Sequence, residues 1–169
     1  MKYGGAWVSY CATEEIYYNT MNDKFYTYDE ALAYLNAGND ANFQKVPFIS
    51  ADRKSFYNFT SKLGHARLSS NHAVLLVGWD DDYSKNNFFY QPNGNGAYLV
   101  KNSWGAGDFD DGYLWVSYYD DNMLYDNSFA IPTVEKTEEG ADIYQHDPIG
   151  LVYQFPDGDY RWGANGFRR

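Results

Sequence analysis

Two short apolar runs, each joined at one end to a polar side chain, constrain the fold of this 169-residue chain most. In the first, Asn71 and His72 precede the run Ala73–Val77; in the second, Asn102 follows the run Ala97–Lys101. Runs of this length and composition predict buried β-strands. If the two strands pair antiparallel, the start of one lies beside the end of the other. The histidine and the asparagine are then expected to meet.

A histidine held by an amide is the arrangement that activates a thiol. A thiol attacks well only as a thiolate, and a neighbouring imidazole can take its proton. A side-chain amide oxygen that accepts the imidazole Nδ1–H keeps the ring in one tautomer and one orientation. His72 is therefore a candidate general base, and Asn102 is a candidate for the residue that orients it.

Several motifs in a fixed order resemble the papain-like cysteine peptidase family. They are His72, Gly78-Trp79, Asn102-Ser103-Trp104-Gly105 and Gly112-Tyr113. The resemblance covers roughly residues 5–131, and several ordered motifs are far more specific than one. It implies that His72 and Asn102 are catalytic, that Trp104 shields their hydrogen bond from water, and that Asn71 lines the substrate cleft. A second Trp-Gly pair, frequent in the family, is replaced by Asp108-Phe109, which predicts a weaker aromatic wall.

The family's nucleophilic cysteine has no good match in this sequence. The only cysteine, Cys11, lies 61 residues before His72, whereas the papain-type signature places about 130–150 residues between the two. The segment Ala6–Cys11 alternates and is rich in aromatic and β-branched residues, which predicts a strand with Cys11 as a small half-buried residue. By resemblance this strand opens the family's second, β-rich domain. We therefore expect the nucleophile in an upstream helical domain and no peptidase activity from residues 1–169 alone.

The predicted fold is mainly β within the α+β class. The resemblance implies the half-open antiparallel, barrel-like second domain of the papain fold with one short helix, plus the start of a β-sandwich. Strands are expected at 5–11, 46–49, 72–79, 97–101, 113–119 and 127–131. Thr27 and Glu30 form a capping-box pattern, Ala31, Leu32, Tyr34 and Leu35 give a short apolar helical face, and Gly38 ends the helix.

Three segments describe the expected domain organisation. Residues 1–133 form the His/Asn-bearing half of the peptidase domain, 134–142 a charged linker, and 143–169 the truncated start of a lectin-like domain such as bacterial relatives carry. An insert at about 28–65 does not align with the family, and we expect a solvated excursion there rather than a wall of the cleft.

Composition limits the partners. The net charge of −10 disfavours nucleic acids and anionic membranes as partners. The sequence contains neither an apolar run of membrane-spanning length nor a signal-peptide pattern. Asp80–Asp82 lack the spacing of a calcium loop. The resemblance implies neither a metal nor an organic cofactor. The resemblance implies protein or peptide substrates, the upstream cysteine-bearing domain as a partner, glycans bound through the appended domain, and an extracellular or cell-surface location for the full-length protein.

Two alternatives stay open. The first alternative to half of a peptidase is a non-catalytic glycan- or protein-binding module on a degenerate peptidase fold. The second is a truncated product without a function of its own. The 18 tyrosines and the lectin-like tail favour the binding module. The presence of both His72 and Asn102 disfavours it, because a module freed from catalysis has no physical need for that pair. A truncated product would expose an apolar patch and be marginally stable.

Overall fold

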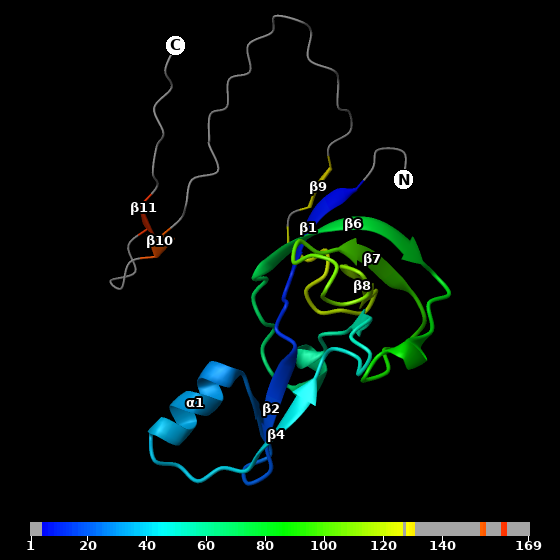
Figure 1. Ribbon diagram of the computed structural model, residues 1–169. Coiled ribbons are helices and arrows are strands. Elements are labelled where there is room, and N and C mark those ends of the chain that lie inside the picture. The colour runs from blue at the N-terminus through cyan, green and yellow to red at the C-terminus, as the bar shows by residue number, and fades with distance from the viewer. Residues whose placement is uncertain (1–4, 127, 131–152, 155–159, 162–169) are drawn as a thin grey trace, which may run out of the picture. The chain divides into compact units, whose positions relative to one another are not determined.

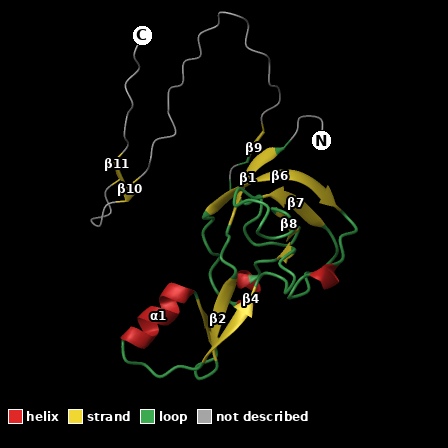
Figure 2. Ribbon diagram, in the orientation of Figure 1, coloured by secondary structure: helices red, strands yellow, loops and turns green. Residues whose placement is uncertain are grey.

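The computed structural model describes residues 5–126, 128–130, 153–154 and 160–161, and the chain divides into two units, 1–133 and 134–169. The first unit consists mostly of strands and loops with one α-helix (Figure 2). In the second unit, β10 (Tyr153–Gln154) pairs antiparallel with β11 (Tyr160–Arg161). The predicted linker lies outside the described residues. Within the described part of the chain, no helix is long and apolar enough to cross a membrane.

The main sheet has six strands in the order β5-β8-β7-β6-β1-β9 (Figure 1). They are β1 (Ala6–Tyr10), β5 (Ser55–Phe56), β6 (His72–Asp80), β7 (Ala97–Lys101), β8 (Tyr113–Ser117) and β9 (Phe129–Ala130). Neighbours are antiparallel except β5 and β8, which are parallel. The predicted mainly antiparallel, unclosed architecture of the α+β class is thus confirmed for the described residues. Residues 127 and 131, at the ends of the strand expected at 127–131, lie outside the described residues, and β9 lies between them.

Alternating apolar residues place the core on one face of this sheet. Val8 lies opposite Val74, and Val100 lies opposite Leu114, and all four side chains are buried. Because side chains alternate along a strand, the neighbouring positions point to the other face. There Trp7 is partly exposed. The buried faces of β6 and β7 therefore hold the ends of these strands, where the polar pair lies, in a fixed register.

The expectation that residues 28–65 form a solvated excursion fits residues 28–45, which are mostly exposed, but is wrong for residues 48–50 and 55–60, which are buried. Phe48, Phe56 and Phe59 are almost completely buried and belong to the same core as Val8. Backbone hydrogen bonds fasten the segment, since Trp115 N–H donates to the Lys54 carbonyl at 2.9 Å. The buried aromatic residues are scattered among polar ones and follow no helical or strand periodicity. The sequence therefore did not reveal that they are buried. The insert is therefore part of the framework that supports β8.

A second, three-stranded sheet carries the helix. Its order is β3-β2-β4, with β2 (Glu15–Asn19), β3 (Lys24–Tyr26) and β4 (Phe43–Pro47), and α1 (Tyr28–Asn36) packs beside it (Figure 1). The capping box of Thr27 and Glu30 is confirmed. The helix buries Ala31 and packs the Tyr34 ring against its sheet. The expected apolar face is only partly correct, because Leu32 and Leu35 remain 44% and 48% exposed.

One buried carboxylate closes the loop that follows β8. The Asp120 side chain accepts backbone N–H groups of Asn58, Asn122 and Met123 at 2.7, 2.9 and 2.8 Å. Asn58 Nδ2 also donates to Asn122 Oδ1 at 3.0 Å. Burial raises the pKa of Asp120 from 3.8 to about 6, although the three N–H donors oppose the rise. This cluster ties the segment after β5 to the segment after β8.

The raised pKa of Asp120 makes the stability depend on pH. Between about pH 4 and pH 6 the folded chain binds a proton at Asp120 that the unfolded chain has released. The free energy of unfolding is therefore expected to fall by up to about 3 kcal/mol as the pH rises through this window, and to level off above it.

The carboxylate of Glu30 affects the stability in a lower pH range. The pKa of Glu30 is lowered, because hydrogen bonds from Thr27 and His65 outweigh the effect of burial, so its contribution is complete above pH 4.5. Urea unfolding at several pH values between about 4.5 and 6.5 measures the remaining slope. Asp120→Asn should remove it, and an identical slope in the variant would show that Asp120 titrates elsewhere.

Candidate active site

The strand register brings His72 and Asn102 together. His72 is the first residue of β6, and its strand partner is Tyr10, at the end of β1. Asn102 follows β7 directly, and its N–H donates to the Gly112 carbonyl at 2.8 Å, which fixes the end of that strand. His72 Nε2 lies 2.8 Å from Asn102 Oδ1. The two side chains meet as the antiparallel pairing predicts.

The nitrogen that faces the amide differs from the expected one. We predicted that Asn102 would accept from Nδ1, but it accepts from Nε2. The sequence could not decide this, because the choice depends on the side-chain torsions of His72 and on the exact path of the chain after β7. No hydrogen bond among the described residues engages Nδ1. The nitrogen available to a reacting thiol is therefore Nδ1.

Asn102 is well placed to fix the ring. Its side chain is buried, with 7% of the residue exposed. Oδ1 accepts a second hydrogen bond, from the Ser103 N–H at 2.9 Å, and so uses both of its lone pairs. Because the Ser103 N–H needs an acceptor, the atom that it shares with His72 is the amide oxygen, and His72 Nε2 must then donate to it. Asn102 Nδ2 is buried without a partner among the described residues.

Aromatic rings enclose His72. The Trp104 ring stacks on the imidazole, with centroids 4.7 Å apart and planes inclined by 28°. Tyr10 contacts it at 5.9 Å, and burial, together with Asp120 and Glu14, raises the pKa of Tyr10, so its hydroxyl stays neutral. The weaker aromatic wall that we expected is not found, because Phe109 supplies a second ring 5.8 Å from Trp104. Trp104 is still 52% exposed.

Asn71 and Cys11 lie beside this group. Asn71 is exposed; its N–H donates to the Tyr10 carbonyl at 3.1 Å, and its Oδ1 accepts the Ala12 N–H at 2.8 Å. These bonds clamp the end of β1 to the start of β6, and the clamped segment contains Cys11. Cys11 is 1% exposed, fully buried rather than half-buried as predicted. The role of Asn71 at a substrate stays a prediction.

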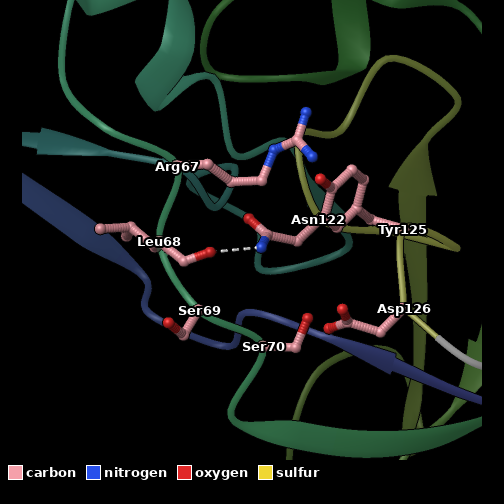
Figure 3. Close-up of a pocket in the computed structure, with 7 residues that line it drawn as sticks. All are labelled: Arg67, Leu68, Ser69, Ser70, Asn122, Tyr125 and Asp126. Atoms are coloured by element: carbon pink, nitrogen blue, oxygen red, sulfur yellow. Dashed lines mark hydrogen bonds between the residues drawn. The ribbon is translucent and has the colours of Figure 1, made fainter.

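Sequence reasoning missed a hollow whose lining includes residues 67–70, which precede His72 in the chain (Figure 3). Its volume is about 380 Å³, and it is lined by Arg67, Leu68, Ser69, Ser70, Asn122, Tyr125 and Asp126. Asn122 Nδ2 donates to the Leu68 carbonyl at 2.5 Å. Ser70 Oγ is buried without a hydrogen-bond partner in the described part of the chain. Two residues span at most about 7 Å, so this hydroxyl lies close to His72. No motif marks these residues, and only their proximity to His72 could have indicated them.

The structure offers no obvious metal centre. Among the described residues, no three His, Cys, Asp or Glu side chains come close enough to hold an ion. Asp80 instead accepts the Asp82 N–H at 2.9 Å, as in an ordinary turn.

The comparisons with known proteins identify the family of this chain. The family model described as "Papain family cysteine protease" matches residues 14–133, a span that includes both His72 and Asn102. The chain belongs to the papain family of cysteine proteases. No curated protein matches it significantly.

Two solved structures of a cysteine protease are similar to this chain. One contains the cysteine protease and lectin-like domains of Cwp84, a surface layer associated protein of Clostridium difficile, with a TM-score of 0.57 and 29% identity over 86% of this chain and 24% of that one. The other is the clostridial cysteine protease Cwp84 after propeptide cleavage, with a TM-score of 0.56 and 26% identity over 90% of this chain and 30% of that one. The chain thus spans less than a third of the length of either structure, 24% of one and 30% of the other.

The observed contact leads to a spectroscopic expectation. Neutral His72 should carry its proton on Nε2, and this proton should exchange slowly with water because Asn102 accepts it at 2.8 Å. In the Asn102→Ala variant the proton should exchange too fast to be detected. Nitrogen-15 NMR of the histidine side chains measures both effects. A proton on Nδ1 in the wild type would contradict the arrangement.

Proposed function

We propose that this chain supplies the general-base half of a papain-family endopeptidase. His72 is the base and later the acid, and Asn102 orients it. The observation that carries the proposal is the 2.8 Å contact between His72 Nε2 and the buried Asn102 Oδ1, covered by the Trp104 ring. This contact leaves Nδ1 for a thiol and gives the imidazole only one productive orientation.

The proposed reaction uses a cysteine from outside residues 1–169. Nδ1 of His72 takes the thiol proton, and the thiolate attacks the carbonyl carbon of a peptide bond. His72 returns the proton to the leaving amine, so that a thioester forms and the C–N bond breaks. His72 then takes a proton from water, and the hydroxide releases the acid and restores the thiol. Cys11 does not serve as the nucleophile in this scheme because its thiol is buried.

An exposed apolar surface beside the site is evidence that another part of a polypeptide packs there. Trp7 and Phe129 pack together with ring centroids 5.4 Å apart, and they are 42% and 61% exposed. Leu75, the strand partner of Trp7, is 41% exposed. A shallow hollow of about 280 Å³ reaches from Trp7 to Asn102. We assign this surface to contact with the cysteine-bearing half of the peptidase domain, because contiguous exposed apolar surface marks an interaction site.

The hollow of Figure 3 is assigned to the substrate. Its lining includes the Ser70 hydroxyl, which has no hydrogen-bond partner among the described residues, and the Asp126 carboxylate, so a protein or peptide side chain with a hydrogen-bond donor fits its chemistry. Residues 1–133 would form the half-domain, 134–142 the linker, and 143–169 the start of a lectin-like domain that binds glycans. A cell-surface location follows the same analogy, since Cwp84 is a surface layer associated protein.

The test uses the assembled peptidase, which we define as residues 1–169 joined to the cysteine-bearing part of a papain-family protease domain such as that of Cwp84. Cleavage of a fluorogenic peptide is expected from the assembled peptidase and not from residues 1–169 alone. Cleavage by residues 1–169 alone, abolished by Cys11→Ser, would overturn the assignment of the nucleophile. Glycan binding by a complex that is well formed but inactive would favour the alternative of a non-catalytic binding module.

A further inference from the structure

Arg53 lies at the far end of a row of contacts that begins at His72. The Trp104 ring stacks on His72 at 4.7 Å, and the Phe109 ring lies 5.8 Å from Trp104. The guanidinium carbon of Arg53 lies 5.2 Å from the centre of the Phe109 ring. A guanidinium at this distance is attracted by the face of an aromatic ring. Arg53 thus contacts the ring of Phe109, which packs on Trp104, and does not contact His72 itself.

Two carboxylates hold Arg53 in this place. Its Nη1 and Nη2 donate to both oxygens of Glu14 at 2.9 and 2.8 Å, and Nη2 also donates to Asp108 Oδ1 at 3.1 Å. Hydrogen bonds from Glu14, and to a smaller extent from Asp108, raise the pKa of Arg53. A two-pronged pair of this kind fixes the plane of the guanidinium as well as its position.

The same contacts hold the backbone of Phe109. Its φ is +56°, a conformation that aromatic residues rarely adopt and that persists only where the surroundings impose it. Asp108 Oδ1 accepts the Phe109 N–H at 3.0 Å, and this is the oxygen that also accepts from Arg53. Arg53 therefore acts on Phe109 twice, through its ring and through the carboxylate that holds its N–H.

Arg53 itself stands on a firm base. Its N–H donates to the Ser50 carbonyl at 2.9 Å in a tight turn. The next residue, Lys54, accepts the Trp115 N–H at 2.9 Å and is thereby fastened to β8. The φ of Arg53 is +58°, so this turn is also held in a conformation that few side chains favour. The insert thus holds the guanidinium of Arg53 against the loop that carries Trp104.

We propose that Arg53 is a positioning residue that keeps the Trp104 ring stacked on His72 by holding Phe109 behind it. The proposal adds to the proposed role of His72 but concerns the geometry of the site alone. Without Arg53, Phe109 loses the partner on its outer face and the support of its backbone. Trp104 then loses its packing contact with Phe109, and its ring is expected to move away from the imidazole of His72.

Three variants of the whole chain test this proposal. Arg53→Asn removes the guanidinium, and asparagine tolerates the positive φ at this position. Arg53→Lys keeps the charge but loses the planar, two-pronged contact. Lys54→Gln is the matched control: its cation pairs with Asp110 at 2.8 Å and its side chain is 48% exposed, against 44% for Arg53, but among the described residues the cation over the Phe109 ring is Arg53 and not Lys54.

The measurement is the proton NMR shift of the His72 ring, which the stacked indole moves upfield. Trp104→Leu defines the position without the stack. Arg53→Asn should move the His72 protons downfield by at least about half of the Trp104→Leu change, Arg53→Lys by less, and Lys54→Gln not at all. The double variant Arg53→Asn/Trp104→Leu should match Trp104→Leu alone, because the two residues act through one contact.

Unchanged His72 shifts in folded Arg53→Asn, or additive shifts in the double variant, would overturn the proposal. If Arg53→Asn does not fold, Arg53→Lys decides by the same criterion. The readout needs no catalysis, so it stands or falls independently of whether His72 is the general base.

Discussion

Replacing His72 with alanine in the assembled peptidase is expected to lower kcat/KM for peptide hydrolysis by at least about 10³-fold. The expected loss is this large because the proposed mechanism uses His72 three times: to form the thiolate, to protonate the leaving amine and to activate water. No other imidazole is held by a buried amide oxygen in the described residues, so nothing replaces it. Binding of the peptide should change little, since His72 contributes to the reacting atoms and not to the substrate hollow.

His65 provides the matched control. It lies in the segment before β6, seven residues ahead of His72, and its Nε2 is 3.0 Å from Glu30 Oε2 instead of facing Asn102. His65→Ala should leave kcat/KM within about threefold of the wild type. Steady-state kinetics on a fluorogenic peptide measures both variants. Similar losses for His65→Ala and His72→Ala would mean that the effect reports folding, and would contradict the assignment.

Replacing Asp120 with alanine is expected to lower the free energy of unfolding by about 4 kcal/mol, the largest stability effect that we expect. The side chain accepts three backbone N–H groups, and its removal leaves all three without a partner in a buried place. The damage should spread to the hollow of Figure 3, because Asn122, which donates to Leu68, is held through Asp120.

Urea unfolding near pH 7 measures this loss, with Asp82→Ala as the control. The Asp82 residue is exposed, so its removal should change the free energy by no more than about 0.5 kcal/mol. Asp120→Asn should lie between the two, since the amide keeps one acceptor oxygen. A loss below about 1 kcal/mol in Asp120→Ala would show that water replaces the carboxylate and that the cluster does not hold the loop.

The sequence predicted the parts that depend on a regular pattern. Alternation located β1 and β8, apolar runs located β6 and β7, and the antiparallel pairing of β6 with β7 was enough to bring His72 to Asn102. Thr27 and Glu30 identified the start of α1, because a capping box depends only on residues three positions apart. These features arise from neighbours in the chain or from one simple pairing.

The parts that were missed depend on distant segments. Phe48 and Phe56 are buried because β5 pairs with β8, and no local pattern announces that pairing. The use of Nε2 by Asn102 depends on side-chain torsions. Phe109 was taken as a loss of the aromatic wall, because the chain does not reveal that Arg53 packs on its ring. Contacts of this kind become visible only with coordinates.

The most direct test of the central claim, that His72 activates a thiol from outside residues 1–169, is the alkylation of that thiol in the assembled peptidase. Iodoacetamide reacts with thiolates, and an ordinary thiol has a pKa of about 8.5. At about pH 6 we expect the attacking cysteine to react at least about 100-fold faster with His72 present than in His72→Ala, while the buried Cys11 stays unmodified. Equal rates with and without His72, in complexes that assemble equally well, would contradict the account.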